Sequence, residues 1–186
     1  MKKILLTFIL SISLSLATTV TFNGVEVTLN SSGLKVGDEA PAFYATTINF
    51  EDTIVGGKKD KIQIIAFVPS FNTTVCQLEV IEFNRKVSKM ENVLLTVVSK
   101  DLPFTQLKFC RDNSIKNIQT VSDYKDANNA KRYGSTISAP VFLEGIFGRV
   151  VYIVDTEGNI AYVEAVKEMT LQPDYNAIIK ALEKIN

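Results

Sequence analysis

The chain alternates short apolar runs with polar, turn-rich stretches, and the apolar runs predict strands. Residues 62–68 and 93–99 are nearly continuous apolar runs, as expected for strands that are covered on both faces. Residues 20–30 alternate apolar and polar side chains around Asn23-Gly24, which predicts a β-hairpin. Further strands are predicted at 44–49 and, on either side of the turn sequence DTEGN, at 150–155 and 160–166.

Three segments predict helices. The first starts at Cys76, the second covers 102–110 with a proline in its first turn, and the third covers 173–185, where Pro173 and Asp174 are start signals. On the first helix the positions at helical spacing are Leu78, Ile81 or Glu82, Arg85 and Val87. From residue 62 a βαβ unit is therefore followed by a ββα unit. This order predicts an α/β, thioredoxin-like fold with three layers (α/β/α) and an added N-terminal β-hairpin.

The first 17 residues have the pattern of a secretory signal. Lys2 and Lys3 precede an uncharged run, Ile4 to Leu16, and Ser15-Leu16-Ala17 offers a cleavage site between small residues. The run is too short to span a bilayer, which needs about 20 residues. We expect residues 1–17 to be a signal peptide, residues 18–186 to form one domain, and the protein to be exported, to a bacterial periplasm. A buried first strand or an uncleaved anchor is the alternative.

Composition removes several classes of function. Of 186 residues, 46% are hydrophobic, which is enough for a sizeable core, and 20 basic residues balance 20 acidic ones. No dense basic run indicates a nucleic-acid surface. The chain has no histidine, so serine–histidine triads, imidazole bases and most zinc sites are excluded. We expect no metal site.

The position of Cys76 suggests chemistry. The apolar run that begins at residue 62 ends at Pro69, and a helix is predicted to start at Cys76. A helix N-terminus favours an anion, and a cysteine in the first turn can have its pKa lowered to roughly 3.5–7.5. The thiolate is the nucleophilic form, and the hydroxyl of Thr73 could donate a hydrogen bond to the sulfur. From these residues alone, Cys76 could equally be a small core residue.

Three motifs carry a resemblance to a known family. "PSFNTTVC" (69–76) closely resembles the Pro-Ser-x-Asp-Thr-x-Val-Cys loop of the thiol peroxidases, the atypical two-cysteine branch of the peroxiredoxins. "SKDLPFTQLKFC" (99–110) resembles the segment that ends in that family's resolving cysteine, and "FGRVVYIVDTEGNIAYVE" (147–164) resembles its arginine-bearing strand. The likeness runs from about residue 20 to residue 182. Two departures are Asn72, where the family has aspartate, and the segment 135–145.

The resemblance implies a role for each site residue. Cys76 would be the peroxidatic residue, whose thiolate attacks the O–O bond of hydrogen peroxide or of an alkyl or lipid hydroperoxide. Arg149 would favour the thiolate and stabilise the leaving oxygen, while Thr73 and the backbone N–H of Cys76 would orient the peroxide. Pro69, Phe71 and Phe147 would line the substrate mouth, although such aromatic residues are also typical of a core. The alternative for Arg149 is a surface ion pair with Glu164.

The resemblance also implies a redox cycle between the two cysteines. The sulfenic acid of Cys76 would condense with Cys110, the resolving cysteine, and a thioredoxin-type dithiol would reduce the Cys76–Cys110 disulfide; no cofactor is implied, and a homodimer is suggested. Consecutive helices can lie on opposite faces of such a sheet, whereas a disulfide needs Cα atoms about 4.4–6.8 Å apart. The two cysteines are then too far apart to bond in the reduced fold. We therefore expect residues 72–80 and 102–114 to open in each cycle.

Two other functions are alternatives for an exported chain with two cysteines. A permanent Cys76–Cys110 disulfide would make the protein a thioredoxin-shaped binding or scaffold domain, since closing such a loop stabilises a fold by ~4 kcal/mol. A thiol–disulfide oxidoreductase is disfavoured, because the chain has no Cys-x-x-Cys motif.

Overall fold

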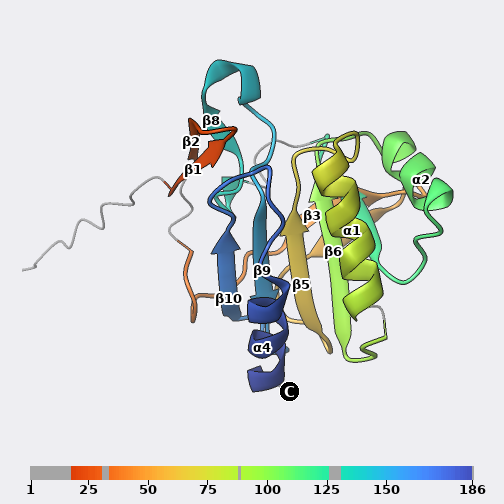
Figure 1. Cartoon of the computed structure of the whole chain (residues 1–186). Coiled ribbons are helices and arrows are strands. Elements are labelled where there is room, and N and C mark those ends of the chain that lie inside the picture. Colours follow the sequence, from red (N-terminus) through yellow and green to blue (C-terminus); the bar gives the residue numbers. More distant parts are fainter. Residues whose placement is uncertain (1–17, 31–33, 88, 126–130, 186) are drawn as a thin grey trace, which may run out of the picture.

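A seven-stranded mixed sheet forms the centre of the protein (Figure 1). The computed structural model describes residues 18–30, 34–87, 89–125 and 131–185, so the predicted signal peptide, residues 1–17, lies outside the described residues. In spatial order the strands are β10 (Ile160–Ala165), β9 (Val150–Val154), β5 (Ile62–Phe67), β6 (Val93–Ser99), β7 (Gln119–Ser122), β3 (Phe43–Thr47) and β4 (Asp52–Val55). Strands β5, β6 and β7 are parallel, and the other neighbouring pairs are antiparallel.

The predicted N-terminal hairpin is confirmed and belongs to a second, smaller sheet. Strands β1 (Thr18–Phe22) and β2 (Val25–Leu29) pair antiparallel, and β8 (Ile137–Ala139) pairs with β2. Asn23 and Gly24 form the two-residue turn with φ values of 50° and 77°. Asparagine and glycine tolerate positive φ better than other residues, and hairpin turns of this kind require it at both positions.

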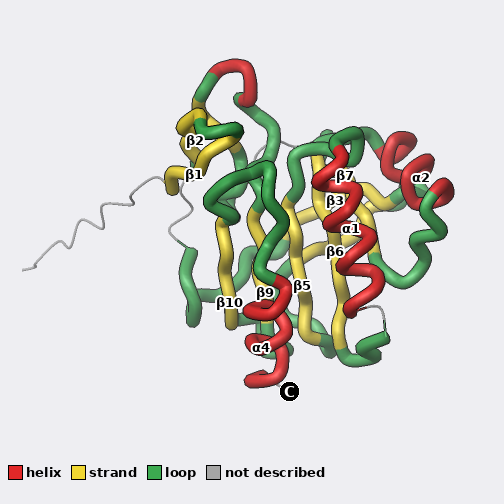
Figure 2. Tube along the Cα trace, in the orientation of Figure 1, coloured by secondary structure: helices red, strands yellow, loops and turns green. Residues whose placement is uncertain are grey.

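Among the described residues, three helices pack on the same face of the large sheet (Figure 2). They are α1 (Thr74–Val87), α2 (Pro103–Asp112) and α4 (Tyr175–Ile185). Their buried residues join one hydrophobic cluster with β5, β6 and β9; the helical members are Cys76, Val80, Phe83, Val87, Phe109, Cys110, Ile178 and Leu182. The expectation that α1 and α2 lie on opposite faces is therefore wrong, because both contribute to this cluster.

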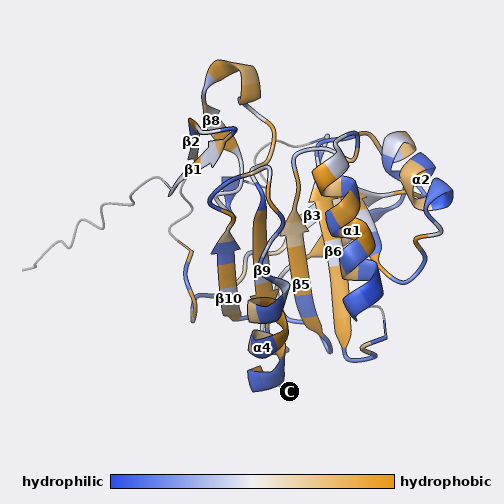
Figure 3. Ribbon diagram, viewed as in Figure 1, coloured by the Kyte–Doolittle hydropathy of each residue, from blue (hydrophilic) through white to orange (hydrophobic). Residues whose placement is uncertain are grey.

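A second hydrophobic cluster covers the other face of the sheet. Ile65 and Phe67 of β5 point into it, while Ile64 and Ala66 point towards the helices, as the two-residue period of a strand requires. The described residues that cover this face come chiefly from the small sheet and from the segment 133–150. Figure 3 shows the predominantly hydrophobic β5, β6 and β9 between these layers. The predicted order of elements from residue 62 onward is confirmed.

The buried face of α1 differs from the predicted one. Its buried residues are Cys76, Glu79, Val80, Phe83 and Val87, whereas Leu78 is 45% exposed. Burial of an apolar side chain such as Phe83 contributes about 1.5–3 kcal/mol, which favours this face. The sequence pattern missed it because Glu79 interrupts the apolar spacing. Among the helices of the described residues, none is long and apolar enough to cross a membrane.

Candidate active site at the start of helix α1

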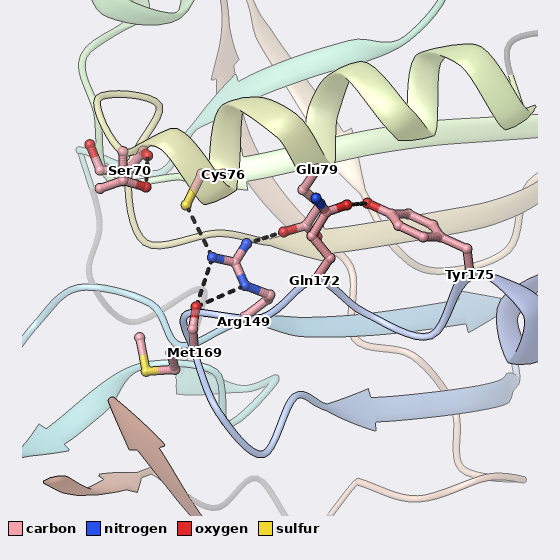
Figure 4. Close-up of polar contacts among 8 residues, drawn as sticks. Ser70, Cys76, Glu79, Arg149, Met169, Gln172 and Tyr175 are labelled. Atoms are coloured by element: carbon pink, nitrogen blue, oxygen red, sulfur yellow. Dashed lines mark hydrogen bonds and ion pairs between the residues drawn. The ribbon is translucent and has the colours of Figure 1, made fainter. Parts of the chain in front are cut away.

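The sheet brings Cys76 and Arg149 together from distant parts of the chain. Strand β5 ends at Phe67, and a short loop leads from it to α1, where Cys76 is the third residue. Strand β9 runs antiparallel to β5 and begins with Val150 opposite Phe67, so Arg149 enters at the edge from which α1 starts. Its Nη2 donates to the sulfur of Cys76 at 3.5 Å (Figure 4). Both side chains are buried: Arg149 is 2% exposed and Cys76 is 0% exposed.

All three nitrogens of the Arg149 guanidinium have partners. Nε and Nη2 donate to the carbonyl of Met169 at 3.2 and 3.0 Å, and Nη1 pairs with the carboxylate of Glu79 (Figure 4). Burial alone would lower the pKa of Arg149, but Glu79 and Cys76 together outweigh burial and raise that pKa above its ordinary value. The alternative of a surface ion pair with Glu164 is wrong.

Glu79 is a site residue that the sequence analysis missed. It is completely buried, and burial raises its pKa from 4.5 to about 7, against the opposing effect of Arg149. Its second carboxylate oxygen has no hydrogen-bond partner among the described residues. Cys76 and Glu79 therefore present two acidic groups to one guanidinium. An acidic residue three positions after the cysteine, on the same helix face, was the available signal.

We expect Glu79→Gln to change how the reactivity of Cys76 depends on pH. The amide keeps an acceptor oxygen for Arg149 but never carries the charge that competes with the Cys76 thiolate. Because Glu79 ionises as the pH rises through about 7, the ratio of the variant's rate of oxidation by hydroperoxide to the wild-type rate should increase across that range. Stopped-flow oxidation of the reduced proteins measures it.

Glu79→Ala is the matched control for this test. It removes the acceptor oxygen along with the charge, so it should react more slowly than Glu79→Gln at every pH. A variant-to-wild-type ratio for Glu79→Gln that is constant on both sides of pH 7 would contradict competition between the two acids.

A cavity of about 180 Å³ opens beside Arg149. Its lining residues are Phe22, Pro69, Ser70, Thr73, Val75, Leu143, Ile146, Arg149, Met169 and Thr170. The predicted site residues Pro69, Thr73 and Arg149 are thus brought together. Phe71 and Phe147, the other two residues predicted at the substrate mouth, do not line this cavity. They lie in the core, edge-on against Phe109 and Phe67 respectively, with ring centroids 5.2 and 5.3 Å apart.

The hydroxyl of Thr73 does not reach the sulfur. It donates instead to the carbonyl of Ser70 at 3.0 Å, so the predicted Thr73–Cys76 hydrogen bond is wrong. The carbonyl of Thr73 accepts the N–H of Gln77 at 3.0 Å and begins the first turn of α1. The hydroxyl oxygen still has lone pairs at the cavity wall, where it can accept a hydrogen bond from a ligand.

Asp101 fixes the loop that carries the site. Its carboxylate accepts hydrogen bonds from the Ser70 hydroxyl at 2.8 Å, the Phe71 N–H at 2.7 Å and the Ser99 hydroxyl at 2.9 Å. Asn72, in contrast, is exposed and lines a separate cleft against α2. The exchange of the family's aspartate for Asn72 therefore changes a charge at that cleft and not in the cavity beside Arg149.

Cys110 lies apart from these contacts in α2. It is 5% exposed, burial raises the pKa of its thiol, and its sulfur is 3.5 Å from the hydroxyl of Thr120. Cys76 and Cys110 are both free thiols. Since each sulfur has its own partner, a disulfide between them requires both contacts to break.

Comparison with known proteins places the chain in a family. The sequence profile of the AhpC/TSA family matches residues 36–163. A thiol peroxidase of Aquifex aeolicus is 41% identical over 91% of this chain and 99% of its own length. The crystal structure of a peroxiredoxin-like protein from Aquifex aeolicus is 40% identical, with a TM-score of 0.87, over 91% of this chain and 99% of that one.

A thiol peroxidase structure from Chromobacterium violaceum is similar in fold, with a TM-score of 0.76 at 19% identity over 89% of this chain and 95% of that one. The predicted thioredoxin-like α/β fold is thereby confirmed. The chain belongs to the AhpC/TSA family and, within it, to the thiol peroxidases.

Proposed function

We propose that this protein is a thiol-dependent peroxidase in which Cys76 reduces hydroperoxides. The observation that carries the proposal is the buried contact between Arg149 and the Cys76 sulfur, beside a cavity, in a chain of this family. The thiolate attacks one oxygen, an S–O bond forms, and the O–O bond breaks. The departing oxygen takes a proton and leaves as water or an alcohol, and Cys76 becomes a sulfenic acid.

The cavity provides a cation and apolar walls for the substrate. Arg149 stabilises the charge that develops on the departing oxygen, because its position is fixed before the reaction begins. Phe22, Val75, Leu143 and Ile146 form apolar parts of the wall, which favours alkyl hydroperoxides beside hydrogen peroxide. The hydroxyl oxygen of Thr73 and the N–H of Cys76 are our candidates for holding the peroxide.

Cys110 is the proposed resolving cysteine. Its thiol displaces water from the sulfenic acid to form the Cys76–Cys110 disulfide, and a thioredoxin-type dithiol returns both thiols. One equivalent of hydroperoxide should therefore remove both thiols of the reduced protein, and a thioredoxin-type reductant should restore them. Thiols that survive one equivalent of peroxide would overturn the proposal and favour the scaffold domain with a permanent disulfide.

We expect the site to open locally when the disulfide forms. Asp101 joins the loop before α1 to the segment just before α2. The buried Phe71–Phe109 pair, a contact worth about 0.5–1.5 kcal/mol, joins the same loop to α2 itself. Amide hydrogen exchange should show that residues 72–80 and 102–114 lose protection on oxidation, while β5 and β6 stay protected. Equal protection of both segments in the two redox forms would contradict this opening.

We also propose that the protein is a homodimer. The loop after β8 extends at the top of Figure 1 and carries η1 (Val141–Leu143), where Val141 is 84% and Phe142 69% exposed. An exposed apolar tip beside the cavity supports an interface between two copies. Light scattering should give twice the chain mass, and Phe142→Ser should lower it; a wild-type monomer would refute the proposal.

Export remains a proposal based on residues 1–17, which lie outside the described residues. Their charged start and uncharged run support cleavage after Ala17 and delivery to a periplasm. The intact mass of the protein from its native cell decides the matter. A mass that retains residues 1–17 in a cytoplasmic fraction would contradict it.

A further inference from the structure

The carboxylate of Glu168 collects five hydrogen bonds beside the active-site cavity. The hydroxyl of Thr21 donates at 2.8 Å, and the backbone N–H groups of Asn23 and Gly24 donate at 3.1 and 3.2 Å. The N–H and hydroxyl of Thr170 donate at 3.0 and 2.7 Å. Three of these donors belong to the N-terminal hairpin, so one side chain joins the hairpin to the segment after β10.

The segment after β10 also carries the Met169 carbonyl, which accepts hydrogen bonds from Arg149. The N–H of Thr21 donates to Lys167 O at 2.6 Å, and the N–H of Met169 donates to Thr21 O at 2.7 Å. Met169 is buried, and its own carbonyl accepts two hydrogen bonds from Arg149. The hairpin therefore holds the backbone whose carbonyl orients the guanidinium.

We propose that Glu168 is a positioning residue: acting through the hairpin and the Met169 carbonyl, it fixes Arg149 against the sulfur of Cys76. The inference rests on the proposed role of Arg149 in the peroxidase reaction. Two contacts to Met169 O and one to Glu79 decide where Nη2 points, and a displaced carbonyl turns it away from the sulfur. Catalysis is sensitive to such displacements, because misplacement by about 1 Å can cost about 100-fold in rate.

The ionisation state of Glu168 does not change near neutral pH, so its hydrogen bonds to the hairpin stay constant. The hydroxyl and N–H of Thr170 and the hydroxyl of Thr21 lower its pKa from 4.5 to about 2. It is therefore ionised throughout the neutral range, and all five donors keep a charged acceptor.

Glu168→Gln tests the proposal on the whole protein. The amide has nearly the same size, but its NH₂ group meets N–H donors and cannot accept from them, so residues 167–170 must shift. We expect the rate at which hydroperoxide oxidises Cys76 to fall about 10-fold. The thiolate fraction of Cys76, read from ultraviolet absorbance at neutral pH, should fall as well. A purely structural role would lower stability and leave both readings unchanged.

Asp174→Ala is the matched control, because it removes the acceptor oxygen that caps α4. Asp174 accepts the N–H groups of Asn176 and Ala177, both at 3.0 Å, in the first turn of α4, and it does not touch Arg149 or Met169. This variant should lose stability and keep the wild-type rate and thiolate fraction. Glu168→Gln behaving in the same way would overturn the proposal.

Thr21→Val decides the question if Glu168→Gln does not fold. It is nearly isosteric and removes one donor to Glu168. We expect the rate of Cys76 oxidation and the Cys76 thiolate fraction each to fall about 2-fold. If neither changes, the proposal is overturned. Wild-type protein that fails to react with hydroperoxide would instead refute the proposed function, which separates the two failures.

Discussion

Cys76→Ser is expected to abolish peroxidase turnover. Serine has almost the same shape, so the contact with Arg149 and the cavity should survive. Its hydroxyl ionises far less readily than a thiol, which leaves almost no nucleophilic anion to attack the O–O bond. Consumption of hydroperoxide with a thioredoxin-type reductant, measured at steady state, should fall to the rate without enzyme.

Cys110→Ser is the control for this result. It keeps Cys76 and should consume one equivalent of hydroperoxide, after which the sulfenic acid persists or is oxidised further. If Cys110→Ser consumes one equivalent of hydroperoxide and Cys76→Ser consumes none, Cys76 attacks the peroxide and Cys110 is needed only for the later disulfide step. Measurable turnover by Cys76→Ser would refute the role given to Cys76.

Arg149→Lys should lower the rate of attack on hydroperoxide 10-fold or more, which corresponds to at least about 1.4 kcal/mol. The guanidinium contacts Met169 O twice, Glu79 once and Cys76 once. A lysine ammonium keeps the charge but presents three donors from a single nitrogen, so it cannot reproduce that geometry. Single-turnover oxidation of the reduced variant is the measurement.

Arg85→Lys provides the control for arginine replacement. Arg85 lies on α1 but is exposed, and it pairs with Glu82 at 2.9 Å. Surface pairs contribute little to stability and this one is remote from the sulfur, so the rate should stay at the wild-type value. An unchanged rate in Arg149→Lys as well would show that a fixed guanidinium is not needed for the attack.

The order of elements was predictable because it depends on local patterns. The apolar runs of β5 and β6, the hairpin turn at Asn23-Gly24 and the proline at the start of α2 each act within a few residues of the chain. The motifs at 69–76 and 147–164 likewise predicted residues that the fold brings to the cavity wall, namely Pro69, Thr73 and Arg149.

The remaining site residues depend on contacts between distant segments. Glu79 is buried because Arg149 lies 70 residues away in sequence and beside it in space, so helical spacing alone suggested an exposed face. Phe71 and Phe147 were placed at the mouth on the motif alone, whereas core packing holds both. No sequence pattern marks the Met169 carbonyl, because every residue has a backbone carbonyl.

The contact between Thr21 and Glu168 joins residues 147 positions apart. The ribosome makes the hairpin first and the segment that carries Met169 nearly last, so Arg149 lacks its carbonyl support until synthesis is almost complete. A growing chain therefore holds Cys76 without its finished cation partner, so the thiol lacks the contact to which we attribute its reactivity. If the chain is exported unfolded, the enzyme acquires its reactivity only after it has crossed the membrane.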